Sequence, residues 1–135
     1  MNDKERLLEY LRNDSKGKID LRWADLRGMR LQCATLSNGD FQFADLSGIE
    51  FTNCKLDGAN LGFTNLKGAS LVHSNLQQAC LFNSDLTGAD LTGSSLKETS
   101  LCYANLTGTI LTDTDLRDAD LTDAVMSDAK LRNLA

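Results

Sequence analysis

The residues that could carry chemistry in this sequence are few and lie far apart. Histidine occurs once, at His73, and the four cysteines form no CxxC pair: Cys33, Cys54, Cys80 and Cys102. A zinc site needs ligands that cluster, and a catalytic nucleophile needs a base beside it. The spacing therefore predicts free thiols that serve the structure. It predicts neither a bound metal nor a catalytic pair.

Aspartate and glycine are frequent, but their spacing does not fit the sites that use them. The aspartates lack the loop spacing and the bidentate acidic residue that complete an EF-hand calcium site. The glycines do not form the GxGxxG pattern that cradles a phosphate. We therefore expect no cofactor and no enzymatic activity.

The composition is that of one acidic domain. The chain has 135 residues, of which 41% are hydrophobic and 6% aromatic, and its formal net charge is −5. No apolar run is long enough for a membrane helix, and the charged start MNDKERLLEYLR differs from a signal peptide. These features favour a cytoplasmic protein without a membrane segment. The acidic balance disfavours direct nucleic-acid binding, which requires basic patches.

A five-residue period organises nearly the whole chain. From Leu21 to Leu131 every fifth residue is leucine, except Phe41, Phe51 and Met126. A small residue often stands two positions before these centres, and Asp or Asn often stands immediately before them. An α-helix turns about 100° per residue and a strand alternates its faces, so neither can bury every fifth side chain on one side. The chain must instead bend in the same direction at every repeat, so that each repeat forms one wall of a tube.

The position two residues after each centre shows how many walls make one coil. Its residue type repeats every twenty residues. Glycine occurs at Gly28, Gly48, Gly68, Gly88 and Gly108, and aromatics occur at Trp23, Phe43, Phe63 and Tyr103, with Asn83 as the gap. Twenty residues correspond to four walls. The pattern predicts an all-β solenoid of about six four-sided coils, in which residues twenty positions apart lie one coil, or roughly 4.8 Å, apart.

The same position should be the third residue of a β-turn between walls. A type II turn needs a positive φ there, which glycine or asparagine adopts readily. Because aromatic residues adopt a positive φ poorly, we expect a different turn type along the aromatic wall. In the interior, Phe41 and Phe51 should face each other across one coil, and Gly39 should compensate for the volume of Phe41.

The repeat resembles that of the pentapeptide repeat family. Its pattern, A(D/N)LXX, occurs as ADLRG, ADLSG, ADLTG and ANLTG, and the match extends over residues 19–133. The resemblance implies a right-handed quadrilateral β-helix, and the handedness comes from the resemblance alone. Many members of the similar family occur in cyanobacteria, and most have no assigned biochemical function.

The chain is expected to divide into two parts. Residues 1–18 should form an N-terminal capping helix and a linker, and residues 19–135 the β-helix. Asn2 or Asp3 can serve as the N-cap of a helix over residues 3–13, which should lie over the first coil and shield its open edge. The last coil has no predicted cap, and we expect it to be filled by Met126, Leu131 and Leu134.

A tube without insertions offers flat walls and no cleft, so we expect its function at the surface. The sequence favours a non-catalytic protein-interaction or scaffold module that binds an unknown protein partner. Outward-pointing aromatic residues are the candidate binding surface: Trp23, Phe43, Phe63, Phe82 and Tyr103. These side chains either shield the turns as a stacking ladder or form an interface, and a homodimer is the simplest interface.

An acidic cluster near the C-terminus supports a second hypothesis. Its members are Asp113, Asp115, Asp118, Asp120, Asp123 and Asp128. Some proteins of the similar family inhibit or protect DNA gyrase by mimicking duplex DNA, so the resemblance implies an acidic DNA-mimic modulator of DNA gyrase or topoisomerase as the alternative. Duplex DNA of the expected rod length, roughly 27 Å, carries about 16 charges, whereas residues 19–135 hold 15 acidic and 9 basic residues, a net charge of −6. The simpler interpretation of the cluster is a solubilising end of the rod.

Overall fold

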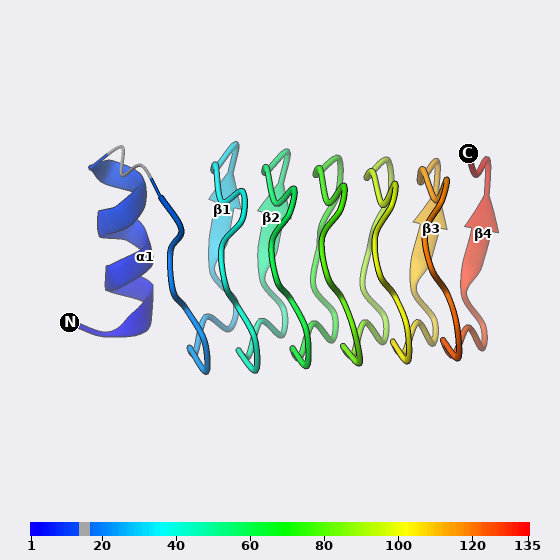
Figure 1. The fold of residues 1–135 in the computed structure, drawn as a ribbon, viewed down its shortest axis with the longest axis horizontal. Coiled ribbons are helices and arrows are strands. Elements are labelled where there is room, and N and C mark those ends of the chain that lie inside the picture. The colour runs from blue at the N-terminus through cyan, green and yellow to red at the C-terminus, as the bar shows by residue number, and fades with distance from the viewer. Residues whose placement is uncertain (14–16) are drawn as a thin grey trace.

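The structure, a computed structural model, describes residues 1–13 and 17–135 as one helix and a stack of coils (Figure 1). Helix α1 (Asp3–Arg12) lies across one end of the stack, and the chain ends at the other. Within residues 1–13 and 17–135, regular strand is confined to four short segments: β1 (Arg30–Gln32), β2 (Glu50–Thr52), β3 (Ile110–Thr112) and β4 (Lys130–Arg132). Among the residues described, no helix is both long enough and apolar enough to cross a bilayer.

Neighbouring coils pair in parallel with a register of twenty residues. β1 pairs with β2 and β3 with β4, and in both pairs the opposed residues are twenty positions apart. Isolated bridges repeat this offset along the stack, from Asp20↔Asp40 to Asn105↔Val125. The predicted stacking of residues one coil apart is therefore confirmed. The strands stay short because the chain bends once in every five residues.

A residue with a positive φ marks the bend in every repeat. The residue two positions after each centre has a positive φ in each repeat from Trp23 to Asn133. The expectation of a different turn along the aromatic wall is wrong, since φ is 63° at Trp23, 62° at Phe43, 57° at Phe63 and 59° at Tyr103. The reason is the bonding between coils: the Trp23 N–H donates to the Gln42 carbonyl at 2.9 Å, as the glycine N–H groups do on the next wall. These bonds fix the bend whatever the side chain.

The interior is a continuous column of apolar side chains. The centre residues from Leu21 to Leu111 point inward and are buried. Phe41 and Phe51 meet edge to face, with ring centroids 6.4 Å apart and ring planes at 70°. A Cβ added at Gly39 would lie 2.8 Å from a ring carbon of Phe41. The predicted pairing of the two rings is confirmed, and the close approach to Phe41 agrees with a compensating role for Gly39.

The structure also explains why Asp or Asn precedes so many centres. The side-chain oxygen accepts a hydrogen bond from the backbone N–H two residues later, as Asp85 does from Thr87 at 3.0 Å and Asn65 from Lys67 at 3.1 Å. The N–H groups that form backbone hydrogen bonds to the neighbouring coils belong to other residues of the repeat. The carboxylate or amide therefore satisfies a turn N–H that would otherwise depend on water.

Helix α1 forms where the sequence predicts a helix, although it ends at Arg12 rather than at residue 13. Asn2 is its N-cap and forms a reciprocal capping box with Glu5. Leu7 faces the first coil and is fully buried. The side chain of Asp3 accepts a hydrogen bond from the Asp25 N–H at 3.0 Å, so the helix also satisfies part of the edge of the coil.

The opposite end of the described chain is more open than the sequence suggests. Met126 is half-buried, but Leu131 and Leu134 are 53% and 41% exposed. The expectation that all three fill the last coil is therefore wrong for the two leucines. An inward-pointing side chain is enclosed only when coils lie on both sides of it, and no further described coil follows this one.

Candidate protein-binding surface

Five outward-pointing aromatic side chains form one continuous row, which we term the aromatic ladder: Trp23, Phe43, Phe63, Phe82 and Tyr103. The first three rings are stacked. Trp23 and Phe43 have centroids 4.3 Å apart and planes at 7°, and Phe43 and Phe63 have centroids 5.0 Å apart and planes at 14°. The ladder thus follows the spacing of the coils and presents a straight apolar strip along one side of the tube.

Phe82 closes the gap that the sequence leaves at Asn83. Residues spaced twenty apart form one column along the stack, and Phe82 belongs to the column next to that of Asn83. Its ring lies edge to face against Phe63, with centroids 5.5 Å apart, and against Tyr103, with centroids 5.6 Å apart. Gly62 stands one coil before Phe82 in its own column and has no side chain to compete for the space. The sequence places Phe82 next to Asn83, and the structure shows that the Phe82 ring bridges Phe63 and Tyr103.

The ladder remains accessible to solvent despite this stacking. Trp23 is 73% exposed, Tyr103 55%, Phe63 43% and Phe43 39%, whereas Phe82 is only partly exposed. Trp23 is the most exposed because it is the first ring of the ladder. The structure therefore confirms that the rings stack, and it leaves a large part of their surface free for contact.

The residues considered for metal binding or nucleophilic chemistry do not come together. Cys33 and His73 are exposed, Cys54 is buried, and Cys80 and Cys102 are partly exposed. Burial raises the pKa of the Cys54 thiol, which makes that sulfur less reactive. In the described part of the chain, no group of three or more potential ligands is placed to hold a metal ion.

The acidic cluster surrounds one coil instead of forming one face. Asp113, Asp118, Asp123 and Asp128 occupy four successive turns, and because the coils pair in a register of twenty residues, no two of them stack on one another. Asp115 is neutralised by Arg117, with the two side chains 2.7 Å apart. A cluster that is contiguous in the sequence is therefore dispersed around the rod.

Asp–Arg pairs along the repeats give the surface its strongest local electrostatics. In three repeats an aspartate before the centre holds the arginine two residues later: Asp20 with Arg22, Asp25 with Arg27, and Asp115 with Arg117. Hydrogen bonds from the arginine side chain, and then from its backbone N–H, lower the pKa of each aspartate to about 2. Each pair brings opposite charges into contact within a single repeat.

We expect acid to destabilise the protein between about pH 4 and pH 2. The folded pKa values, about 2, lie below the ordinary value of 3.8, so the stabilising contribution is complete above 3.8 and is lost as the pH falls through 2. Arg27→Gln should return the pKa of Asp25 towards 3.8 in a carboxyl ¹³C NMR titration. Arg132→Gln, at the far end of the chain, should leave it unchanged. An Asp25 pKa that stays low in the Arg27 variant would contradict the assignment.

Comparison with known families agrees with the repeat described above. The family model described as Pentapeptide repeats (8 copies) matches residues 19–58, 49–88, 79–118 and 103–133. HetL, a pentapeptide repeat protein involved in heterocyst differentiation regulation in the cyanobacterium Nostoc sp. strain PCC 7120, is 31% identical, with a TM-score of 0.71. The alignment covers 87% of this chain and 65% of HetL, so this chain spans slightly less than two thirds of the length of HetL.

Two further solved structures are similar. Rfr23, a pentapeptide repeat protein of the cyanobacterium Cyanothece 51142, has a TM-score of 0.82 at 21% identity, over 93% of this chain and 97% of that one. A pentapeptide repeat protein of the Arabidopsis thaliana thylakoid lumen is 30% identical, with a TM-score of 0.58, over 78% of this chain and 73% of that one. No curated protein matches the sequence.

Proposed function

This chain belongs to the pentapeptide repeat family, and from that membership we propose that it is a non-catalytic protein-interaction scaffold whose partner docks on the aromatic ladder. We include in this proposal the full family architecture, a right-handed quadrilateral β-helix of about six coils with α1 as its N-terminal cap. The turn in every fifth residue and the twenty-residue register support four walls per coil. The buried Leu7 supports the capping role of α1.

The conformation of the exposed aromatic residues is the observation that carries the proposal. A left-handed conformation costs an ordinary residue roughly 1–2 kcal/mol, and glycine adopts it without that cost. Each aromatic pair returns roughly 0.5–1.5 kcal/mol, so the ladder gains little stability over a glycine column such as Gly28 and Gly48. Stability alone therefore gives little reason for aromatic residues at these turns, and this supports a role in binding.

The ladder also has the properties of a binding surface. Aromatic side chains contribute most of the affinity at many protein interfaces. The stacked rings of Trp23, Phe43 and Phe63 are already held in place by one another, so a partner would lose little side-chain entropy by ordering them. The simplest partner is a second copy of this chain, with the two ladders face to face.

We expect Phe43→Ser combined with Phe63→Ser to abolish association while the fold persists. The changed side chains lie outside the tube, so far-ultraviolet circular dichroism should keep its native shape. Sedimentation velocity should show a lower mass for the variant if two ladders meet, and pull-down from the source cell extract should show a lost partner if the partner is another protein.

Gln78→Ser combined with Glu98→Ser is the matched control. Both residues occupy the same turn position on another wall, with φ of 60° and 59°, and both are exposed. This control should associate like the wild type. A wild-type protein that stays monomeric and captures nothing would reduce the ladder to a device that shields the turns.

The alternative function, a DNA-mimic modulator of gyrase or topoisomerase, has the acidic cluster as its support. Such mimicry needs negative charge in rows along the rod, because duplex DNA carries one charge per about 1.7 Å of its axis. The turn positions of Asp113, Asp118, Asp123 and Asp128 instead encircle one coil. Under our proposal a gyrase supercoiling assay with excess protein should show no inhibition, and inhibition would favour the alternative.

A further inference from the structure

A groove separates the C-terminal half of α1 from the first coil. Tyr10 and Leu11 form one side, and residues 31–35 form the other. Its volume of about 410 Å³ lies within the range of roughly 300–1,000 Å³ that is typical of ligand pockets. The groove exists because α1 has ten residues, a length of about 15 Å, and does not extend over every wall of the coil beneath it.

The floor of the groove is an unpaired strand edge. In the second coil, Glu50 donates its N–H to the Met29 carbonyl of the preceding coil at 2.8 Å, and Ser70 repeats this bond one coil later. Arg30 holds the same position in the first coil, where no coil precedes it. Among the described residues, the Arg30 N–H and the Gln32 carbonyl, on the side of β1 away from β2, have no hydrogen-bond partner. Gln32 lines the groove, and Arg30 is the residue immediately before the lining residues 31–35.

On the walls beside that of β1, side chains of helix α1 form hydrogen bonds with the backbone groups at the open edge of the first coil. Its Asp3 side chain accepts from the Asp25 N–H, and its Arg6 side chain donates to the Asp20 carbonyl. A complete coil, including one from a second copy of this chain, cannot stack at this end because α1 already occupies those walls. A single extended segment can still reach β1.

The pairing of β1 with β2 shows which segment suits this edge. Arg30 lies opposite Glu50, and their side chains form an ion pair at 3.4 Å. Leu31 lies opposite Phe51 in the same register. The Arg30 side chain is nevertheless 82% exposed, so its guanidinium can hold a second carboxylate that approaches from the groove.

We propose that this groove binds an extended segment of a partner protein, in which an acidic residue precedes a large apolar residue. The segment adds to β1 as a parallel strand. It offers a carbonyl to the Arg30 N–H, an N–H to the Gln32 carbonyl and its carboxylate to the Arg30 guanidinium, while its apolar side chain packs on Leu31, Tyr10 and Leu11. This site is separate from the aromatic ladder, so either can fail without the other.

The probe for this site is a peptide of residues 48–53, GIEFTN, with blocked termini, because it copies the β2 strand that β1 already accepts. Hydrogen exchange of the intact protein, followed by NMR, should show that the peptide slows exchange of the Arg30 amide. A peptide of the same composition in scrambled order should not. An Arg30 amide that is already protected in the free protein would overturn the proposal, because another part of this chain would then occupy the groove.

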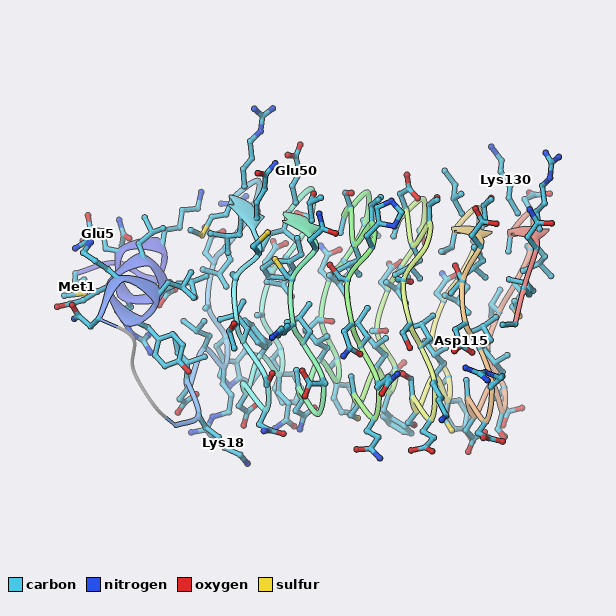
Figure 2. The ribbon with its side chains drawn as sticks, turned by 90° about the horizontal axis from the view of Figure 1, so that it is seen from above. Met1, Glu5, Lys18, Glu50, Asp115 and Lys130 are labelled. Atoms are coloured by element: carbon cyan, nitrogen blue, oxygen red, sulfur yellow. The ribbon has the colours of Figure 1, made fainter. Side chains whose placement is uncertain are left out.

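Charge reversal tests the register. Arg30→Glu should weaken binding of GIEFTN by roughly tenfold, since it replaces an exposed ion pair with a like-charge contact. The peptide GIKFTN should regain the lost affinity with this variant. Lys130→Glu is the control, because Lys130 lies in the same column at the far end of the stack, on the side of the molecule where Glu50 lies (Figure 2). Equal binding of GIEFTN to the Arg30 variant and the wild type would overturn the proposal.

Discussion

Replacing Leu76 with alanine is expected to lower the free energy of unfolding by about 2–5 kcal/mol. Leu76 is fully buried in the middle of the stack. The walls around the resulting cavity cannot collapse, because the Leu76 N–H is bonded to Ser95 of the following coil and the Asn75 N–H to Cys54 of the preceding one. Equilibrium unfolding in urea measures the loss.

Gln77→Ala is the matched control for this cavity. Gln77 is the next residue along the chain and its side chain is exposed, so its replacement should change the free energy of unfolding by less than about 0.5 kcal/mol. Equal losses at the two positions would mean that the assignment of inward and outward side chains is wrong.

Gly39→Ala is expected to cost about 1–3 kcal/mol, although it adds only one methyl group. The new Cβ would lie 2.8 Å from the Phe41 ring and 3.2 Å from both the Ile19 side chain and the Leu36 carbonyl oxygen. The ring cannot retreat freely because it is fully buried against Phe51. The change in unfolding free energy should therefore appear without any loss of a native contact.

A double-mutant cycle with Phe41→Leu distinguishes this overpacking from a general intolerance of side chains at residue 39. The leucine side chain is shorter, so Gly39→Ala should cost less in the Phe41→Leu protein than in the wild type. If the two costs prove equal, the contact with Phe41 is not the cause and the compensating role of Gly39 is refuted.

The register of the coils could be predicted from the sequence, whereas the conformation of the aromatic turns could not. Glycine recurs every twenty residues from Gly28 to Gly108 and so reveals the register directly, because the turn position is the one where residue type matters most. The conformational preference of a single aromatic residue predicts a different turn. In the tube, the N–H groups of Trp23 and Gly28 both bond to the next coil, at 2.9 and 3.0 Å, and these shared bonds override the preference.

The candidate surface was predicted in part, for similar reasons. Trp23 and Phe43 can be predicted to lie side by side because they are twenty residues apart, and the register alone decides which residues stack. The bridging role of Phe82 depends on the direction of its side chain across two columns, which spacing does not reveal. The groove beside Leu11 was missed because the sequence indicates that a helix covers the first coil, but not that its ten residues leave part of that coil uncovered.

The twenty-residue register also restricts how the length of this protein can change over evolution. An insertion of one residue would turn every later leucine out of the tube. An insertion of five would keep the leucines inside, but it would move each later column by one wall, so that ladder residues such as Phe63 would no longer follow Phe43. Only insertions or deletions of whole coils preserve both the interior and the surface columns. Gene duplication in units of sixty nucleotides is thus the change in length that this architecture accepts without disturbing its binding face.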